Sequence, residues 1–365
     1  MNILYLTTHL NTGGITSYLL SLCRAMKSKG HNVYLASSGG DCLLKFEQEG
    51  VKFVPISIKT KAEISPKILI SLRQLALLIK QENIQIVHSN TRVTQVLAEL
   101  LRRFYSVKHI STCHGFFRMK LSRRLFSCWG DKVVAISSQV RDHLVNDLGV
   151  PANKIAIVHN GIDIDKFRVK GQGLSDKEKQ AMGLGGGPVI GIIARLSDVK
   201  GHIYLIQAMK TVLEKFPAAT LLIVGEGKER GRLIQLASSL GIEKQVIFIS
   251  SVSDTRHILS VLDVFVMPSL HEGLGLALME AMAFGLPVIG SKVGGILSLI
   301  EDGKSGILVE SRDVVGLSVA LIKVLSDNAA AKSLGENAAR FIGNNFGLEK
   351  MAEETERVYV KCLEK

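Results

Sequence analysis

The sequence contains few cysteines, few aromatic residues and no long uninterrupted apolar run. Its five cysteines are odd in number, scattered and without metal-site spacing, which argues against a disulfide framework and favours a reducing compartment. Because no run of about 18 uncharged apolar residues is present, we do not expect a membrane-spanning helix. The opening residues MNILYLTTHL lack a basic region and predict a first strand rather than a signal peptide. The expected location is the cytoplasm.

Aromatic side chains make up only 5% of the chain, whereas hydrophobic residues make up 47%, enough for a substantial buried core. The net charge of +12 is unevenly distributed. Residues 1–165 contain 21 Lys and Arg against 11 Asp and Glu, whereas the remainder contains 24 against 22. The basic first half predicts an acidic partner, such as an anionic membrane surface or a phosphorylated acceptor. Nucleic acid is disfavoured, because aromatics are few and no nucleic-acid module is recognisable.

Two successive series of alternating strands and helices predict an α/β fold with parallel, doubly wound sheets. The first series begins with a strand at Asn2–Thr7, a helix at Ile15–Lys29 and a strand at His31–Ala36. A polar, Lys- and Gly-rich stretch at Arg168–Gly187, with a short helix at Ser175–Met182, interrupts the rhythm before it restarts. We therefore predict three parts: an N-terminal domain at 1–167, a C-terminal domain at 168–345, and a helix at 346–365 that packs back on the N-terminal domain.

The stretch Pro268–Gly290 has the features of a ligand site at the end of a strand. A short apolar run precedes it, and Gly273 and Gly275 stand directly before a helical run. Amides at a helix N-terminus, approached through glycines, favour a phosphate. The stretch also carries Glu272 and Glu280, which would repel a phosphate but accept hydrogen bonds from sugar hydroxyls. Together these features predict a sugar-nucleotide site.

Two further groups of residues lie just past predicted strands. Arg195 and Lys200 follow the strand at Val189–Ala194, and a guanidinium fork with an ammonium group suits a diphosphate. Gly13 and Gly14 follow the first strand, as in a dinucleotide-binding turn, but the GxGxxG pattern is absent. That absence makes a nicotinamide-dependent oxidoreductase a weak alternative.

The order of these pieces along nearly the whole chain resembles that of the retaining GT-B glycosyltransferases of family 4. The matching pieces are Gly13-Gly14; His114-Gly115; Asn160-Gly161-Ile162-Asp163 with Phe167; Arg195; Lys200-Gly201; Val224-Gly225-Glu226-Gly227; Pro268-Ser269; Glu272; Glu280; and Gly294-Gly295. Two positions depart from the family pattern, since Ser298 stands where an acidic residue is usual and Ser250 where glycine is usual. Both lie near the expected nucleotide base and ribose, so the nucleotide stays open.

The resemblance implies a GT-B architecture, in which two Rossmann-like domains face a central cleft and the donor nucleotide lies mainly on the C-terminal domain. Such an enzyme moves a hexose-type sugar from an NDP-sugar to an acceptor hydroxyl, with retention of configuration. The implied catalytic residues are His114, Glu272, Arg195 and Lys200. The implied donor-binding residues are Gly13, Gly14, Gly273, Leu274, Gly275 and Glu280.

Within that scheme, Arg195 and Lys200 would hold the diphosphate and leave Glu272 for the sugar and Glu280 for the ribose. No DxD-like motif is evident, so we expect neither a metal nor another cofactor, only the NDP-sugar as co-substrate. The leaving phosphate would itself take the acceptor proton in a front-face reaction. His114 would meet the donor sugar from the N-terminal domain, whereas His9, His88 and His159, also at strand ends, are interpreted as structural.

The segment Phe116–Trp129, directly after His114, interleaves basic and large apolar residues as interfacial helices do. We hypothesise that it docks on an anionic membrane surface and presents a glycan or lipid-linked acceptor. A cytoplasmic enzyme would then work peripherally at the inner face of the membrane, in cell-envelope glycan or glycolipid synthesis. The alternative is a helix that packs its apolar face on the sheet. For the whole chain, a second alternative is a non-catalytic sugar-nucleotide or glycan-binding protein on the same fold.

Overall fold

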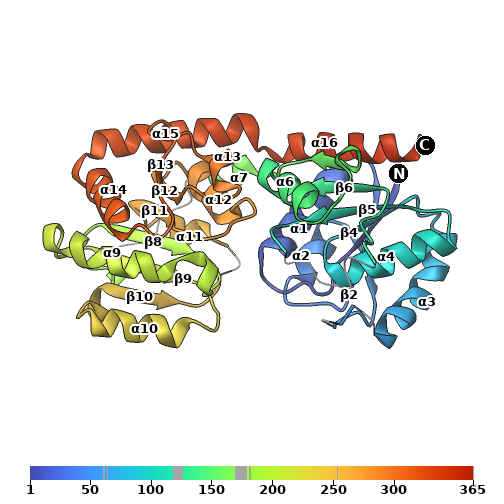
Figure 1. Ribbon diagram of the computed structural model, residues 1–365, viewed down its shortest axis with the longest axis horizontal. Coiled ribbons are helices and arrows are strands. Elements are labelled where there is room, and N and C mark those ends of the chain that lie inside the picture. Colours follow the sequence, from blue (N-terminus) through green and yellow to red (C-terminus); the bar gives the residue numbers. More distant parts are fainter. Residues whose placement is uncertain are drawn as a thin grey trace. The chain divides into compact units, whose positions relative to one another are not determined.

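The computed structural model describes residues 1–60, 62–63, 65–117, 126–168, 179–180, 182–252 and 254–364. The chain divides into two α/β units, one formed by Met1–Gly161 with Leu348–Lys365 and the other by Ile162–Gly347 (Figure 1). The boundary between the two units, after Gly161, therefore falls a few residues before the predicted boundary after Phe167. Most of the predicted short helix at Ser175–Met182 lies outside the described residues.

The first unit contains a seven-stranded parallel sheet with the strand order β3-β2-β1-β4-β5-β6-β7. Its strands are β1 (Asn2–Leu6), β2 (Asn32–Ser37), β3 (Lys52–Pro55), β4 (Ile86–Ser89), β5 (Lys108–Cys113), β6 (Lys132–Ala135) and β7 (Ile155–Ile157). The central strands are buried along nearly their whole length, as expected where helices cover both faces of a parallel sheet. The order reverses between β1 and β4, and such a switch point is where doubly wound sheets bind ligands.

Helices flank this sheet in Figure 1. They are α1 (Gly14–Ser28), α2 (Leu43–Gln48), α3 (Pro66–Gln81), α4 (Arg92–Phe104), α6 (Ser138–Asn146) and α16 (Leu348–Leu363), with a 3-10 turn at Ala152–Lys154. Local sequence sets two of their starts: Ser65 caps α3 ahead of Pro66, and Thr91 and Thr94 form a capping box at α4. The C-terminal helix α16 packs on α1 within this unit and buries Met351, Tyr359 and Cys362.

The second unit repeats the arrangement with a six-stranded parallel sheet in the order β10-β9-β8-β11-β12-β13. Its strands are β8 (Val189–Ile193), β9 (Thr220–Val224), β10 (Val246–Ile249), β11 (Val264–Met267), β12 (Val288–Ser291) and β13 (Ile307–Val309). The switch point lies between β8 and β11, and the predicted phosphate-binding and sugar-binding residues follow these two strands. The two parallel α/β sheets confirm the predicted fold class.

The helices of the second unit hold the switch point between β8 and β11 in place. They are α7 (Ile164–Arg168), α9 (His202–Lys215), α10 (Arg230–Ser239), α11 (Arg256–Leu259), α12 (Leu276–Phe284), α13 (Ile296–Leu299), α14 (Val314–Ser326) and α15 (Asn328–Asn345). Left-handed glycines bound α12, with φ of 101° at Gly275 and 85° at Gly285. Along the described helices, none alone has the length and hydropathy to cross a bilayer; α14 and α15, bent by 104°, pass only as a pair.

Candidate active site

The loops after β8 and β11 are locked together at the switch point of the second unit. The amide of Leu270 donates to the carbonyl of Val199 at 2.8 Å. Gly201 has a φ of 72°, and a Cβ added there would lie 1.8 Å from the carbonyl oxygen of Pro268. Only glycine allows this approach, so the Lys200-Gly201 pair fixes the distance between the two loops.

This packing brings Lys200 and Glu272 into direct contact. Lys200 Nζ lies 2.5 Å from Glu272 Oε2, and Ser269 Oγ donates to the same oxygen at 3.3 Å. Their side chains are only 20% and 11% exposed, which makes the charge-assisted bond stronger than a surface pair. The sequence pointed to separate partners for these two residues, a phosphate for Lys200 and a sugar for Glu272. In the structure they form one polar unit.

Arg195 stands on a turn that two glycines support. Leu196 donates its amide to the carbonyl of Glu226 at 2.9 Å. A Cβ on Gly225 or Gly227 would lie 2.1 Å from a carbonyl oxygen of this turn. The Arg195 side chain is exposed and, among the residues that the structure describes, forms no ion pair, so its guanidinium is available to an anionic ligand.

The amides of Gly273, Leu274 and Gly275 lead into the N-terminus of α12. The second glycine pair supports this loop, because the amide of Gly295 donates to the carbonyl of Glu272 at 3.0 Å, and a Cβ on Gly295 would lie 2.2 Å from the carbonyl oxygen of Gly273. Leu274 is buried, so its side chain packs inward and only its backbone can serve a ligand. Backbone amides at a helix start favour an anion.

Glu280 is the one charged residue in the otherwise apolar helix α12. Burial raises its pKa to about 7, an effect that the hydrogen bond from Thr255 and the charge of Lys166 reduce and that of Asp254 reinforces. Thr255 Oγ1 donates to Glu280 Oε2 at 2.8 Å. Sequence reasoning missed Thr255 and Lys166, although the polar residues between β10 and α11 were a usable signal for Thr255.

In the first unit, His114 follows β5 at the level of the switch point. Its Nε2 lies 3.1 Å from Oδ1 of Asn90, which follows β4. The ring of Tyr18 on α1 meets the imidazole edge-on, with centroids 4.8 Å apart. Burial lowers the pKa of His114 to about 3, so the imidazole is neutral at pH 7. The exposed Gly13 and Gly14 start α1, where their amides can reach an anion.

Beneath His114 runs a buried chain of hydroxyl and imidazole groups. His88 contacts Tyr359 OH at 2.5 Å through Nδ1 and Thr112 Oγ1 at 2.6 Å through Nε2. Tyr359 OH lies 3.0 Å from Tyr5 OH, and Thr112 Oγ1 lies 3.3 Å from Tyr18 OH. His88 is fully buried and satisfied on both nitrogens, consistent with its structural interpretation. The chain links α16 to the helix that carries Tyr18.

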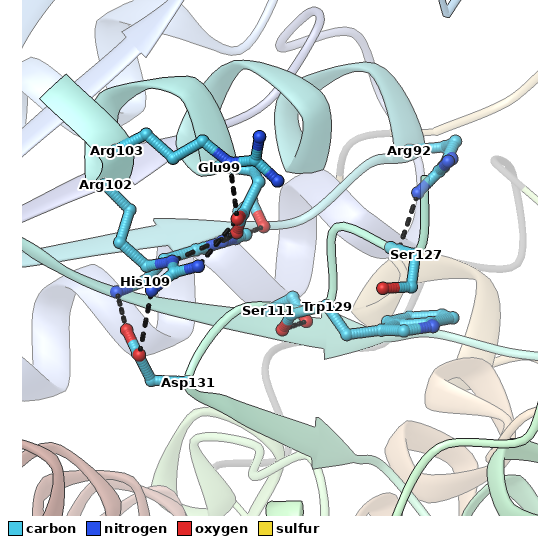
Figure 2. Close-up of polar contacts among 10 residues, drawn as sticks. Arg92, Glu99, Arg102, Arg103, His109, Ser111, Ser127, Trp129 and Asp131 are labelled. Atoms are coloured by element: carbon cyan, nitrogen blue, oxygen red, sulfur yellow. Dashed lines mark hydrogen bonds and ion pairs between the residues drawn. The ribbon is translucent and has the colours of Figure 1, made fainter. Parts of the chain in front are cut away.

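Figure 2 shows a second polar cluster of this unit, around Glu99 on α4. Its carboxylate contacts Arg102, Arg103 and His109. Burial alone would raise the pKa of Glu99, but the hydrogen bonds and charges of His109 and Arg102 outweigh burial and hold this pKa well below its ordinary value. Arg102 also reaches Asp131 at 3.5 Å. Both arginines are thus paired with carboxylates of the same unit.

The acceptor segment Phe116–Trp129 is described only at its two ends, because 118–125 lie outside the described residues. The hypothesis that this segment contacts a membrane must be corrected at Trp129. This residue is only 6% exposed, so its ring offers no surface to a membrane. Figure 2 shows the reason: Ser111 Oγ donates to the Trp129 carbonyl at 2.7 Å, and Arg92 binds the carbonyl of Ser127 at 2.9 Å. Three phenylalanines of the segment are exposed: Phe116, Phe117 and Phe126.

Across the described residues, no group of three or more His, Cys, Asp or Glu side chains is arranged to hold a metal ion.

Comparisons with known proteins agree with the geometry. The family model for group 1 glycosyl transferases matches residues 175–341, and that for glycosyltransferase family 4 matches residues 12–166. The D-inositol 3-phosphate glycosyltransferase of Corynebacterium urealyticum is 30% identical over 71% of this chain and 68% of its own length. An Escherichia coli protein, UDP-Gal:alpha-D-GlcNAc-diphosphoundecaprenol alpha-1,3-galactosyltransferase, is 28% identical over 85% of this chain and 84% of its own length.

Among solved structures, Anabaena HepE in complex with UDP-glucose superposes with a TM-score of 0.85 at 20% identity, covering 99% of this chain and 100% of the HepE chain. At that identity the superposition shows the fold alone, which is GT-B. The two family models together span both units, and the Corynebacterium relative adds a match across most of its own length. The chain belongs to glycosyltransferase family 4, whose members are retaining GT-B enzymes that use nucleotide-sugar donors.

Proposed function

We propose that this glycosyltransferase transfers a hexose from an NDP-sugar to a hydroxyl of a glycan or lipid-linked acceptor, in the synthesis of a cell-envelope glycan or glycolipid. The observation that carries the proposal is the arrangement at the β8/β11 switch point. There, the Lys200–Glu272 pair stands directly before the amides that open α12, and Arg195 follows the neighbouring strand β8. The Escherichia coli relative supports the acceptor class, because its name describes a sugar on a lipid diphosphate.

The diphosphate is assigned to Arg195, Lys200 and the amides of Gly273–Gly275. Arg195 offers a planar fork and Lys200 a point charge, and both stabilise the negative charge that grows on the leaving diphosphate. When phosphate oxygens approach Lys200, its ammonium group has donors to share between phosphate and Glu272, since it carries three N–H bonds. Glu272 then accepts from the hydroxyls of the donor sugar.

Glu280 is assigned to the ribose. An ionised carboxylate accepts from both ribose hydroxyls, and Thr255 holds one of its oxygens in place. In the first unit, neutral His114 is assigned to a hydroxyl of the donor sugar, because an imidazole in this state carries one donor and one acceptor.

The bond changes balance without an enzyme nucleophile. The bond from the anomeric carbon to the diphosphate oxygen breaks, and a bond to the acceptor oxygen forms on the same face. The acceptor proton passes to the leaving phosphate oxygen, so the configuration is retained. The residues named above then bind, orient and stabilise charge, which accounts for the largest share of many enzymatic rate enhancements.

A panel of UDP-, GDP- and ADP-sugars tests the proposal in two measurements. The matching donor should raise the midpoint of thermal unfolding by mass action, and the enzyme should slowly release its nucleoside diphosphate without an acceptor. A variant with Arg195→Ala and Lys200→Met is the control and should show neither effect. Stabilisation without release would instead support the non-catalytic binding protein, and no response to any sugar nucleotide would contradict both readings.

A further inference from the structure

Asn90 is a buried polar residue that sequence reasoning did not single out. It follows β4 directly, is 2% exposed, and stands beside the switch point between β1 and β4. The backbone N–H of Asn90 donates to the carbonyl of Leu6 at 3.0 Å, which fixes the backbone of Asn90 to the end of β1. Its side chain contacts His114, which follows the neighbouring strand β5.

The orientation of the Asn90 amide is set by its neighbours. Nδ2 lies 3.5 Å from the carbonyl oxygen of Leu6 and 3.4 Å from that of His88. The reverse orientation would turn Oδ1 toward two carbonyl oxygens, none of which can donate a hydrogen. Oδ1 therefore faces His114, at 3.1 Å from Nε2.

An amide oxygen only accepts, so Nε2 of His114 must carry the hydrogen. Burial keeps the imidazole neutral, which leaves Nδ1 without a hydrogen and with a free lone pair. Tyr18 holds the ring from the side, and its own hydroxyl is tied to Thr112. The position of the ring and its protonation are thus both defined within the first unit.

We propose that Asn90 is a positioning residue that fixes His114 as the Nε2–H tautomer and so presents Nδ1 as a hydrogen-bond acceptor for a sugar hydroxyl. This inference rests on the proposed function for its substrate, but the tautomer itself does not. It specifies the direction of the hydrogen bond: the substrate hydroxyl donates to His114. The role of His114 is then orientation of a hydroxyl, because a neutral ring with an acceptor at Nδ1 has no proton to give there.

Among the residues that the structure describes, two titratable side chains face His114. Tyr18 faces it from α1 and His88 from β4, and burial favours the neutral form of both. Cys113 precedes it on β5 and donates through Sγ to the carbonyl of Gly115 at 3.3 Å. A carboxylate at position 90 would be a new charge in this surrounding, and it would stabilise the imidazolium.

The first test reads the tautomer directly in the full-length protein without substrate. Long-range proton–nitrogen correlation spectra of protein with labelled histidine distinguish the two ring nitrogens, and the spectrum of His114→Gln assigns the signal among the 10 histidines. We expect a hydrogen on Nε2 and none on Nδ1 from about pH 6 to about pH 8. A hydrogen on Nδ1, or on both nitrogens, would overturn the proposal.

The second test uses Asn90→Asp, with the exposed Asn153→Asp as the matched charge control. In the Asn90 variant, turnover should fall about tenfold for each pH unit below the raised pKa of His114 and recover as the pH rises. A loss that is equal at every pH indicates a merely structural role and overturns the proposal, as does a profile parallel to that of the control. If His114→Ala keeps full turnover while the spectra show Nε2–H, the proposed role of His114 fails and the tautomer assignment stands.

Discussion

Glu280 shows how a buried charge in a binding site bears on stability. Burial raises its pKa in the folded protein from the ordinary value of a glutamate to about 7. Because the folded pKa lies above the unfolded one, the stability that this group contributes is fully present below the unfolded pKa. It is lost as the pH rises through the folded pKa, where the buried carboxyl must ionise.

We predict that Glu280→Gln raises the midpoint of thermal unfolding at about pH 8 and leaves it nearly unchanged near pH 5, because the amide never ionises. Glu336→Gln on α15, whose side chain is 60% exposed, is the control and should shift neither midpoint. The same Glu280 variant should bind the donor more weakly by about 1.5–3 kcal/mol in calorimetry. An equal rise in both midpoints would show that ionisation is not the cause.

His114 gives a second prediction at the scale of one residue. Replacing it by alanine removes the group assigned to the donor sugar hydroxyl but leaves Arg195, Lys200 and Glu280 in place. We therefore expect turnover to fall by about 10²-fold, because the sugar is no longer held in its reactive orientation, while donor affinity falls much less, since the diphosphate contacts stay. Steady-state kinetics and calorimetry on the same protein measure both quantities. Near-normal turnover, or a loss of affinity that matches the loss of rate, would contradict the assignment.

At the scale of elements, Gly201 makes the contact between the β8 and β11 loops. Gly201→Ala would strain a φ of 72° and force a Cβ to within 1.8 Å of a backbone oxygen of Pro268. We expect a loss of at least about 2 kcal/mol in the free energy of unfolding, together with weaker donor binding, because Lys200 moves with the loop.

Gly231, in α10, is the matched control for Gly201. A Cβ there has no neighbour within 4 Å, and the backbone is helical. Gly231→Ala should therefore keep the wild-type stability or raise it by up to about 1 kcal/mol, with unchanged donor binding. Denaturant unfolding of the three proteins decides the matter. A Gly201 variant as stable as the Gly231 variant would show that the loop contact is dispensable.

The helices and strands also show how much of the structure could be predicted from the sequence. Alternating apolar runs and glycine-flanked turns placed the main strands and the residues that follow them, because strand ends depend on local patterns. The pairings could not be predicted, since Lys200 and Glu272 are 72 residues apart and Asn90 and His114 are 24 apart. Such pairs depend on which strands become neighbours. Short helix α2 was missed, because six residues carry too little periodicity.

At the scale of the whole molecule, both units use one rule. Each sheet reverses its strand order once, and the residues assigned to ligands follow the strands on either side of that point or one strand further. A polar segment is different, since its role depends on what covers it. Trp129 illustrates this point. The composition of the segment Phe116–Trp129 suggested a surface anchor, but Trp129 is buried, and hydrogen bonds to the backbone around it hold it in the fold.

The uneven charge of the chain leads to the last prediction, that the full-length protein binds anionic but not neutral vesicles. The basic residues Arg118, Lys120, Arg123 and Arg124 lie between exposed Phe116–Phe117 and exposed Phe126. In flotation, binding to vesicles rich in phosphatidylglycerol should weaken as salt shortens the range of attraction.

Replacing the three phenylalanines by serine should weaken binding about tenfold or more, because their rings no longer enter the interface. Phe104→Ser, at a phenylalanine that is 68% exposed on α4, is the control and should bind like the wild type. Equal binding to neutral and anionic vesicles, or binding to neither, would contradict the prediction.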